Sequence, residues 1–221
     1  REQAQMMGAR VLLSKLDSLP IAQPDNNLWA LTELVTKRRA LVKNCVIFKN
    51  QLHTNIMHHY PSYKSFFTVF DCPTALAFWE TYPSPLKLKV ITVEELGEFL
   101  KKHSHNFYST KKAQEIFDLM EKDGDTTNEM QEIRDFIVST SVKQLKENNN
   151  VIKSIEEQVK ILLPKLGFQL ETMKGINVIT ASSLIAEIGN IDRFSSSAKM
   201  ASYAGISPVQ YSSGQTDKNF S

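Results

Sequence analysis

The sequence predicts a mainly α-helical protein, and two observations support this. Glycine and proline are sparse, with eight of each among 221 residues, and both are rare in the long periodic segments. Apolar residues recur at steps of three and four through residues 28–59 and 127–163, a spacing that places them on one face of a helix. We therefore predict a long-helix linker with a helical insertion, followed by a small domain that resembles a helix-hairpin-helix unit.

The first long helix is expected to begin at Leu28 and to end before Pro61, because proline disfavours helical backbone at the preceding residue. Its apolar seam is interrupted by Arg38 and Lys49 and consists of Leu31, Val35, Val42, Cys45, Leu52 and Ile56. Imperfect heptads of this length are typical of a helix that pairs with another helix in a coiled coil. The partner can be the second long helix or a second copy of the protein.

Short helices are expected between the two long ones. Asp71 can cap a helix that has Pro73 in its first turn. Thr92 and Glu95 form a capping-box pattern at the start of the next helix. A third short helix begins at residues 109–110, with its apolar residues again on one face.

The second long helix is predicted over Thr127–Leu163, although the run Asn148–Asn150 weakens it locally. Beyond it, the sequence predicts a helix, a tight turn at Gly175 and a second helix that ends at Gly189. A short helix over Ala198–Tyr203 follows.

The turn at Gly175 could bind nucleic acid. The start of the helix that follows presents free backbone N–H groups and the positive end of the helix dipole, both of which favour a phosphate. Helix-hairpin-helix units usually carry two glycines, and here the second is replaced by Asn177, which can still adopt a left-handed turn. The candidate DNA-backbone contacts are therefore Gly175, Asn177 and Thr180. A plain helical corner that binds nothing is an equal alternative.

No metal site is predicted. Residues 123–128 begin like a calcium loop, but Asn128 and Arg134 occupy the positions that require glycine and glutamate, so a helix-capping turn is expected. No cysteine or carboxylate accompanies His53, His58 and His59 at the spacing of metal ligands, and we expect them to be surface histidines near a helix end.

Bulk properties limit the class of protein further. The net charge is only +2, and basic clusters such as Lys37–Arg39 fit either a solvated face or a nucleic-acid contact. Neither an apolar run of about 18 residues nor a signal peptide is present. We expect a soluble cytoplasmic protein without membrane contact, in which Cys45 and Cys72 are unpaired thiols. Because the chain starts with Arg1, we expect a fragment or a processed chain.

Ser212 and Ser213, followed by Gly214, lie in a stretch without helical or strand periodicity. A serine needs a nearby base, a metal ion or an anion-stabilising pocket to act as a nucleophile. Taken alone, the stretch is expected to be a polar loop.

The C-terminal part resembles a known family. Residues Met173–Phe194, Ser197–Pro208 and Ser212–Gly214 are similar, at fixed spacing, to the C-terminal domain of bacterial transposases of the IS110 insertion-sequence family, with its IS116 and IS902 relatives. The first half resembles the segment that follows the family's nuclease-like domain, over residues 29–42, 49–53 and 59–63.

The resemblance implies a domain organisation and a chemistry. Family members combine a ribonuclease-H-like domain, a coiled-coil linker and a C-terminal domain. By this comparison residues 1–27 are the end of the nuclease domain, residues 28–169 the linker with its insertion, and residues 170–221 the transposase domain. Four acidic residues of the family bind divalent metal (Mg²⁺), and a serine attacks DNA and becomes joined to it. That serine corresponds to Ser213, with Ser212 as the second choice.

The sequence also departs from the family. The acidic metal ligands are not recognisable here: Glu2 is the only acidic residue near the last such motif, and we do not assign it as a ligand. Relatives continue beyond the position of Ser221. We therefore expect a truncated fragment that holds no cofactor and has no independent catalytic activity.

Two functions follow from the resemblance. The chain is expected to belong to a transposase that binds insertion-sequence DNA in the bacterial cytoplasm, forms homo-oligomers through the linker and, in some members, uses a guide RNA. The alternative is a catalytically inactive nucleic-acid-binding remnant that acts through linker-mediated assembly. Composition alone would also permit a helical scaffold without nucleic acid.

Overall fold

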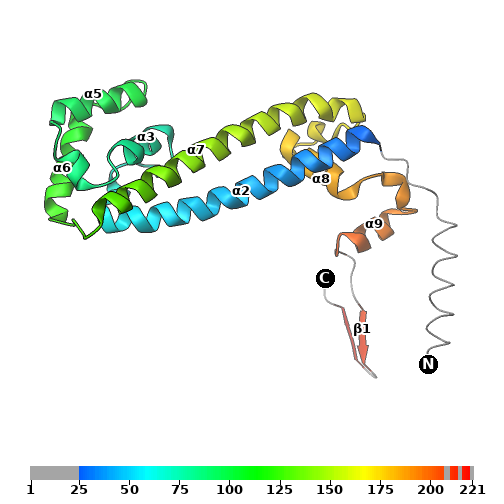
Figure 1. Ribbon diagram of the computed structural model, residues 1–221. Helices are drawn as coiled ribbons and strands as arrows, with labels where there is room; N and C mark the ends of the chain where they lie inside the picture. Colours follow the sequence, from blue (N-terminus) through cyan, green and yellow to red (C-terminus); the bar gives the residue numbers. More distant parts are fainter. Residues whose placement is uncertain (1–24, 207–209, 214–215, 220–221) are drawn as a thin grey trace, which may run out of the picture. The chain divides into compact units, whose positions relative to one another are not determined.

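A computed structural model describes residues 25–206 and the backbone of residues 210–213 and 216–219 (Figure 1). The chain divides into two compact units. One comprises residues 33–164, and the other combines residues 25–32 with the described residues after 164. The segment predicted to end a nuclease domain, residues 1–27, and Glu2 within it lie almost entirely outside the described residues.

The first unit is built on two long helices, as predicted. Helix α2 covers Asn26–His59 and α7 covers Gln131–Leu162. They are antiparallel neighbours (Figure 1), because Arg38 Nε contacts Glu156 Oε1 at 2.8 Å while Cys45 Sγ, further along α2, donates to Asn149 Oδ1 at 3.7 Å. The coiled-coil geometry itself stays a prediction.

Helix α7 begins later than the predicted Thr127. Asp125 Oδ1 accepts from both the backbone N–H (3.1 Å) and the hydroxyl (2.7 Å) of Thr127, which ties these residues into a local turn instead. Met130 then adopts a left-handed backbone with a φ of 57°, directly before the first helical residue.

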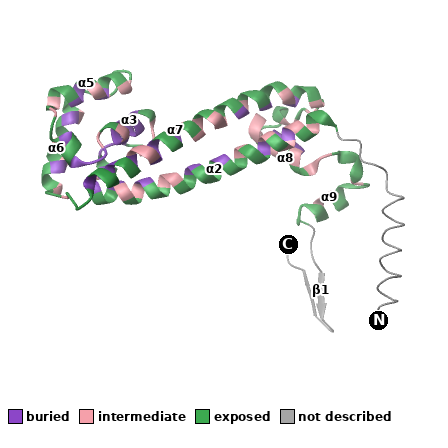
Figure 2. Cartoon of the chain, in the orientation of Figure 1, coloured by how far each residue is buried: buried purple, intermediate pink, exposed green. Residues whose placement is uncertain are grey.

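The insertion between the long helices is entirely helical in its described elements. These are η1 (Tyr63–Ser65), α3 (Pro73–Thr81), α4 (Pro85–Leu88), α5 (Val93–His103) and α6 (Thr110–Asp123). Its buried residues gather around α3 and α6 and the adjoining part of α7 (Figure 2). Trp79 is fully buried, and its indole Nε1 donates to the carbonyl of Phe70 at 3.1 Å. Aromatic burial of this kind supplies a large share of the stabilisation of a small core.

Helix starts in the insertion follow the sequence with one correction. The capping box of α5 is confirmed: Thr92 Oγ1 accepts from the N–H of Glu95 at 3.2 Å, and the Glu95 carboxylate accepts from the N–H of Thr92 at 2.8 Å. The N-cap of α3 is Cys72 rather than Asp71, because the Cys72 sulfur accepts from the N–H of Ala75 at 3.4 Å. Asp71 forms an ion pair with Lys49 of α2 instead.

The second unit contains short elements. These are η2 (Leu163–Leu166, of which the unit holds the last two residues), η3 (Leu170–Thr172), α8 (Val178–Ile188), η4 (Ile191–Arg193) and α9 (Ser197–Tyr203). The predicted α-helix before Gly175 is only a single 3₁₀ turn. Gly167 and Gly175 both have left-handed backbones, with φ of 72° and 92°. The intervening segment is too short to offset the cost of nucleating an α-helix.

The second unit also contains a strand pair that the sequence analysis did not predict. Strands β1 (Gln210–Ser213) and β2 (Thr216–Asn219) pair antiparallel, with Ser213 opposite Thr216. The expectation of a loop without strand structure was therefore wrong. The rest of the described chain is mainly α-helical, as predicted.

Candidate nucleic-acid interface

The N-terminus of α8 is built by Gly175 and Asn177. Gly175 has a φ of 92°, where L side chains are strained. Asn177 is the N-cap, and its backbone is extended (φ −88°, ψ 170°) rather than left-handed as the sequence analysis allowed. Its Oδ1 accepts from the N–H of Thr180 at 2.8 Å and from the Thr180 hydroxyl at 3.1 Å. A side-chain cap requires this extended backbone, which explains the difference.

This cap changes which groups can meet an anion. The N–H of Thr180 is used internally, and the first intrahelical bond runs from the N–H of Ala181 to the carbonyl of Asn177 at 2.9 Å. Within the described part of the chain, no acceptor takes the N–H of Val178 or Ile179. These two donors, with the exposed Lys174 before the turn, are the groups placed to contact a phosphate.

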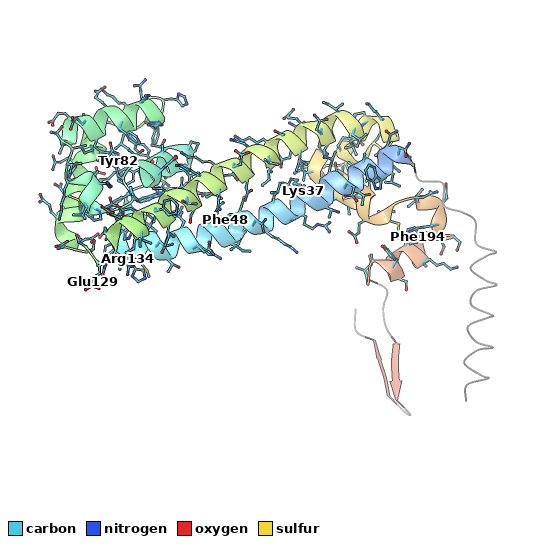
Figure 3. All side chains as sticks on the ribbon, in the orientation of Figure 1. Lys37, Phe48, Tyr82, Glu129, Arg134 and Phe194 are labelled. Carbon is cyan, nitrogen blue, oxygen red and sulfur yellow. The ribbon has the colours of Figure 1, made fainter. Side chains whose placement is uncertain are left out.

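An arginine near the other end of α8 was missed by the sequence analysis. The guanidinium carbon of Arg193 lies 4.6 Å from the ring centres of both Phe194 and Tyr203. Phe194 lies in the turn between α8 and α9 (Figure 3), and the Tyr203 hydroxyl donates to the carbonyl of Glu187 at 3.4 Å. Two rings thus hold an exposed guanidinium in place, and guanidinium groups suit phosphate oxygens. The adjacent pair Arg193 and Phe194 was the signal in the sequence that could have indicated this arrangement. The contact with Tyr203 depends on tertiary structure, so no local pattern indicates it.

The candidate nucleophile is described only as backbone. Ser213 is the last residue of β1, and Ser212 precedes it opposite Asp217. Their side chains, and Gly214 as a whole, lie outside the described residues. The assignment of Ser213 therefore stays a prediction.

The expectation of surface histidines holds only for His58. His53 is half-buried, with its ring stacked on Phe70 at 3.6 Å and its Nδ1 3.0 Å from the hydroxyl of Tyr63. His59 is only 2% exposed. Among the described residues no group of three or more His, Cys, Asp or Glu side chains could hold a metal ion.

His59 belongs to a buried polar network that fixes its tautomer. Its Nδ1 lies 2.6 Å from the carbonyl of Pro83, which can only accept, so Nδ1 carries the proton. The amide nitrogen of Gln131 donates to His59 Nε2 at 3.2 Å and to Asp135 Oδ1 at 2.8 Å. The Gln131 oxygen accepts from the N–H of Asn128 at 3.2 Å, which supports this amide orientation. A second proton on His59 would meet the amide donor of Gln131.

The pKa of His59 is accordingly shifted. Burial lowers this pKa most, and the nearby charges of Arg134 and His58 act in the same direction. The hydrogen bond to Pro83 and the carboxylate of Asp135 oppose the shift. The net effect is a lowered pKa, because the folded protein disfavours the charged form of this histidine.

Comparison with known proteins gives one match. Residues 168–220 match the family described as transposase IS116/IS110/IS902. No curated protein and no solved structure matches the chain. The matched segment contains η3, α8, η4, α9 and both strands, and it covers less than half of the chain.

This match confirms the predicted resemblance for the C-terminal segment, and the family named is one of insertion-sequence transposases. The resemblance of residues 29–63 lies outside the match and stays a prediction. No described helix has both the length and the continuous apolar character needed to cross a bilayer.

Proposed function

We propose that the chain acts in DNA transposition as part of a transposase that binds insertion-sequence DNA. The observation that carries this proposal is the family match over residues 168–220, which includes the Gly175 turn, α8 and Ser213. In this proposal the N–H groups of Val178 and Ile179 bind a backbone phosphate. Arg193, held between its two rings, binds another.

Ser213 is proposed as the nucleophile. Its Oγ forms a bond to a backbone phosphorus atom and loses its proton to a base, while the bond from that phosphorus to one bridging oxygen breaks. That oxygen takes up a proton and leaves as the free hydroxyl end of the cut strand. The strand stays attached through a serine phosphodiester and can be rejoined without further energy input. The residues that the structure describes supply no metal-ligand set, so no metal-bound step is derived from them. The carboxylates for such chemistry would come from another part of the transposase.

One experiment tests this proposal. The chain, alone and joined to an acidic nuclease domain of the same family, is incubated with labelled insertion-sequence end DNA and divalent metal, then denatured and separated on a gel. We expect duplex binding that weakens steeply with salt, and an adduct in the joined protein that Ser213→Ala abolishes and Ser212→Ala leaves intact. An adduct that survives Ser213→Ala but disappears in Ser212→Ala would move the assignment to Ser212.

The second candidate is an inactive nucleic-acid-binding remnant that acts through linker-mediated assembly. A specific observation favours assembly: the start of α7 exposes a group of large apolar side chains, namely Met130, Ile133, Phe136 and Ile137. This candidate predicts duplex binding and self-association without any adduct in either preparation. A guide RNA and a location in the bacterial cytoplasm, which the resemblance implies, stay predictions.

A further inference from the structure

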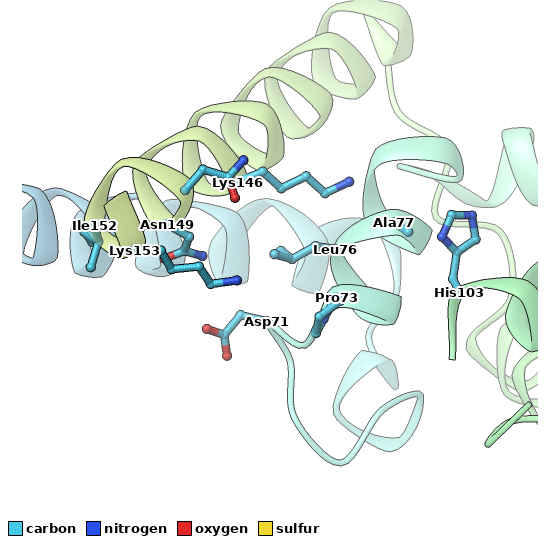
Figure 4. A pocket seen from close by; sticks show the side chains of 10 residues that line it. Asp71, Pro73, Leu76, Ala77, His103, Lys146, Asn149, Ile152 and Lys153 are labelled. Carbon is cyan, nitrogen blue, oxygen red and sulfur yellow. The ribbon is translucent and has the colours of Figure 1, made fainter. Parts of the chain in front are cut away.

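A pocket of about 580 Å³ lies in the first unit, between α3, the end of α5 and the middle of α7 (Figure 4). Pockets of roughly 300–1,000 Å³ hold small organic ligands in proteins. The side chains around this one combine lysines and amides with an apolar surface. They are Asp71, Pro73, Leu76, Ala77, His103, Lys146, Asn149, Asn150, Ile152 and Lys153.

The wall formed by α7 is polar and regularly spaced. Lys146, Asn149, Asn150 and Lys153 follow one another at steps of three, one and three, so they lie on one face of the helix. Seven residues separate the two lysines, which corresponds to about 10 Å along the helix axis. Between them, the oxygen of Asn149 accepts from Cys45, which leaves its amide N–H₂ group to donate. From the sequence, the Asn148–Asn150 run was expected only to weaken the helix. In the structure it contributes two amides to the pocket.

The opposite wall is apolar. Pro73, Leu76 and Ala77 come from the first two turns of α3, whereas Ile152 adds one apolar side chain to the α7 wall. Pro73 is exposed and presents most of this surface, while Leu76 and Ala77 are buried behind it and fix it in place. A flat apolar ligand face would displace water from this surface.

The charges around the pocket leave one cation available. Asp71 is paired with Lys49, and Lys146 is paired with Glu80. Within the part of the chain that the structure describes, Lys153 has no acidic partner. Its ammonium group lies beside Asp71 (Figure 4), whose charge is balanced by Lys49. Because both ion pairs are neutral overall, Lys153 leaves a net positive charge at the pocket, which favours an anionic ligand.

We propose that this pocket binds a nucleotide, with the base against Pro73 and Leu76 and a phosphate at Lys153. The amides of Asn149 and Asn150 can meet the base edge, since asparagine offers the donor and acceptor pattern that bases present. A base inside a duplex is stacked and paired and cannot enter without being extruded. The ligand is therefore a free mononucleotide or an unpaired nucleotide of a strand. The possibility that the ligand is an unpaired nucleotide of a strand rests on the proposed function. It adds to that function a nucleic-acid contact outside the family-matched segment.

The full chain provides the test. Fluorescence anisotropy with a labelled single-stranded oligonucleotide measures strand binding, and calorimetry with adenosine monophosphate or inorganic phosphate measures the small ligands. We expect Lys153→Gln to weaken single-strand binding about tenfold, as the loss of a charge-assisted contact does. Lys160→Gln removes an equal charge from the same helix, where Lys160 pairs with Glu157 outside the pocket, and should change binding by less than about twofold.

The outcomes distinguish a free mononucleotide from a nucleotide of a strand, and they distinguish the pocket proposal from the proposed function of the C-terminal segment. Competition by adenosine monophosphate at micromolar concentration identifies a mononucleotide site, whereas binding of the oligonucleotide alone identifies a strand contact. Equal effects of Lys153→Gln and Lys160→Gln, or inorganic phosphate competing as well as the nucleotide, would overturn the nucleotide assignment. Duplex binding by the C-terminal segment is measured separately with Arg193→Gln, so its absence would leave the assignment of the pocket unaffected.

Discussion

At the scale of single residues, His59 predicts a pH-dependent stability. Its pKa is lowered in the folded protein, whereas histidine in an unfolded chain titrates near about 6.5. Above that pH both states are neutral and stability is full. As the pH falls through this value, the unfolded chain takes up a proton that the folded chain refuses, so the free energy of unfolding decreases until the folded pKa is reached.

Urea unfolding at pH 7.5 and pH 5.5 measures this effect. We expect the wild type to lose stability at the lower pH and His59→Gln to lose less, although His53 and His103, whose pKa values are also lowered by burial, retain their share. At pH 7.5 His59→Gln should itself be less stable by about 1–3 kcal/mol, because buried partners lose their hydrogen bonds. His58→Gln, at the exposed neighbouring position, should stay close to the wild type, because the charge of His58 is the smallest of the causes that lower the pKa of His59. An equal pH dependence in His59→Gln and wild type would contradict the assignment.

The same residue shows where sequence reasoning stops. His59 looked like a surface histidine because its neighbours in the sequence contain no ligand set. Its actual partners, the carbonyl of Pro83 and the amide of Gln131, come 24 and 72 residues later. Arg193 is similar: Phe194 is adjacent in sequence, but Tyr203 reaches it only because η4 and α9 fold back. Side-chain environments of this kind depend on tertiary contacts that no local pattern contains.

At the scale of elements, regular features were predictable and short ones were not. Both long helices and the α5 capping box follow from periodicity and local capping chemistry. Around Gly175 the sequence indicated the turn and the helix after it, but not that the segment before it is a 3₁₀ turn. Gly167 and Gly175, both with left-handed backbones, flank this stretch. An α-helix and a 3₁₀ turn differ little in free energy over so short a segment, so packing decides between them.

The cap of α8 yields a prediction that separates folding from DNA binding. Asn177→Ala removes the acceptor of the Thr180 N–H and should destabilise the second unit by about 1 kcal/mol. Asn177→Asp keeps the acceptor but places a negative charge beside the N–H groups of Val178 and Ile179. We expect this variant to remain as stable as the wild type while its affinity for duplex DNA falls about tenfold.

Hydrogen exchange of the α8 amides reports the first effect, and anisotropy with duplex DNA reports the second. Thr92→Asp serves as the control, because Thr92 caps α5 in the first unit through an equivalent side-chain bond to the N–H of Glu95 at 3.2 Å. DNA affinity that is equal in Asn177→Asp and wild type would show that α8 does not present its N-terminus to a phosphate.

At the scale of the whole molecule, apolar surface is divided between the core and an exposed group. The predicted seam of α2 packs largely inside the first unit, where Cys45, Leu52 and Ile56 join the core formed with α3 and α7. The seam is therefore satisfied within one chain, and it does not by itself require a second copy. The exposed group at the start of α7 has no such partner among the described residues: Phe136 is 69% exposed and Ile133 56%.

This exposed group predicts self-association. Ile133 and Phe136 are three residues apart, with Met130 and Ile137 beside them, so they form one apolar surface on the helix. In a symmetric dimer each side chain is buried twice, and burial of one such side chain contributes about 1.5–3 kcal/mol.

Sedimentation measures this association. We expect the wild type to sediment as a dimer at micromolar concentration, and the double variant Ile133→Ser, Phe136→Ser to dimerise at least about a hundredfold more weakly. Val90→Ser removes an equally exposed side chain, 79% accessible, from the insertion and should leave the dimer intact. Two outcomes would contradict dimerisation through this surface: a wild type that stays monomeric, and a Val90→Ser variant that dissociates as readily as the double variant. Either would assign the surface to another partner, because an exposed apolar area of that size costs solubility unless something covers it.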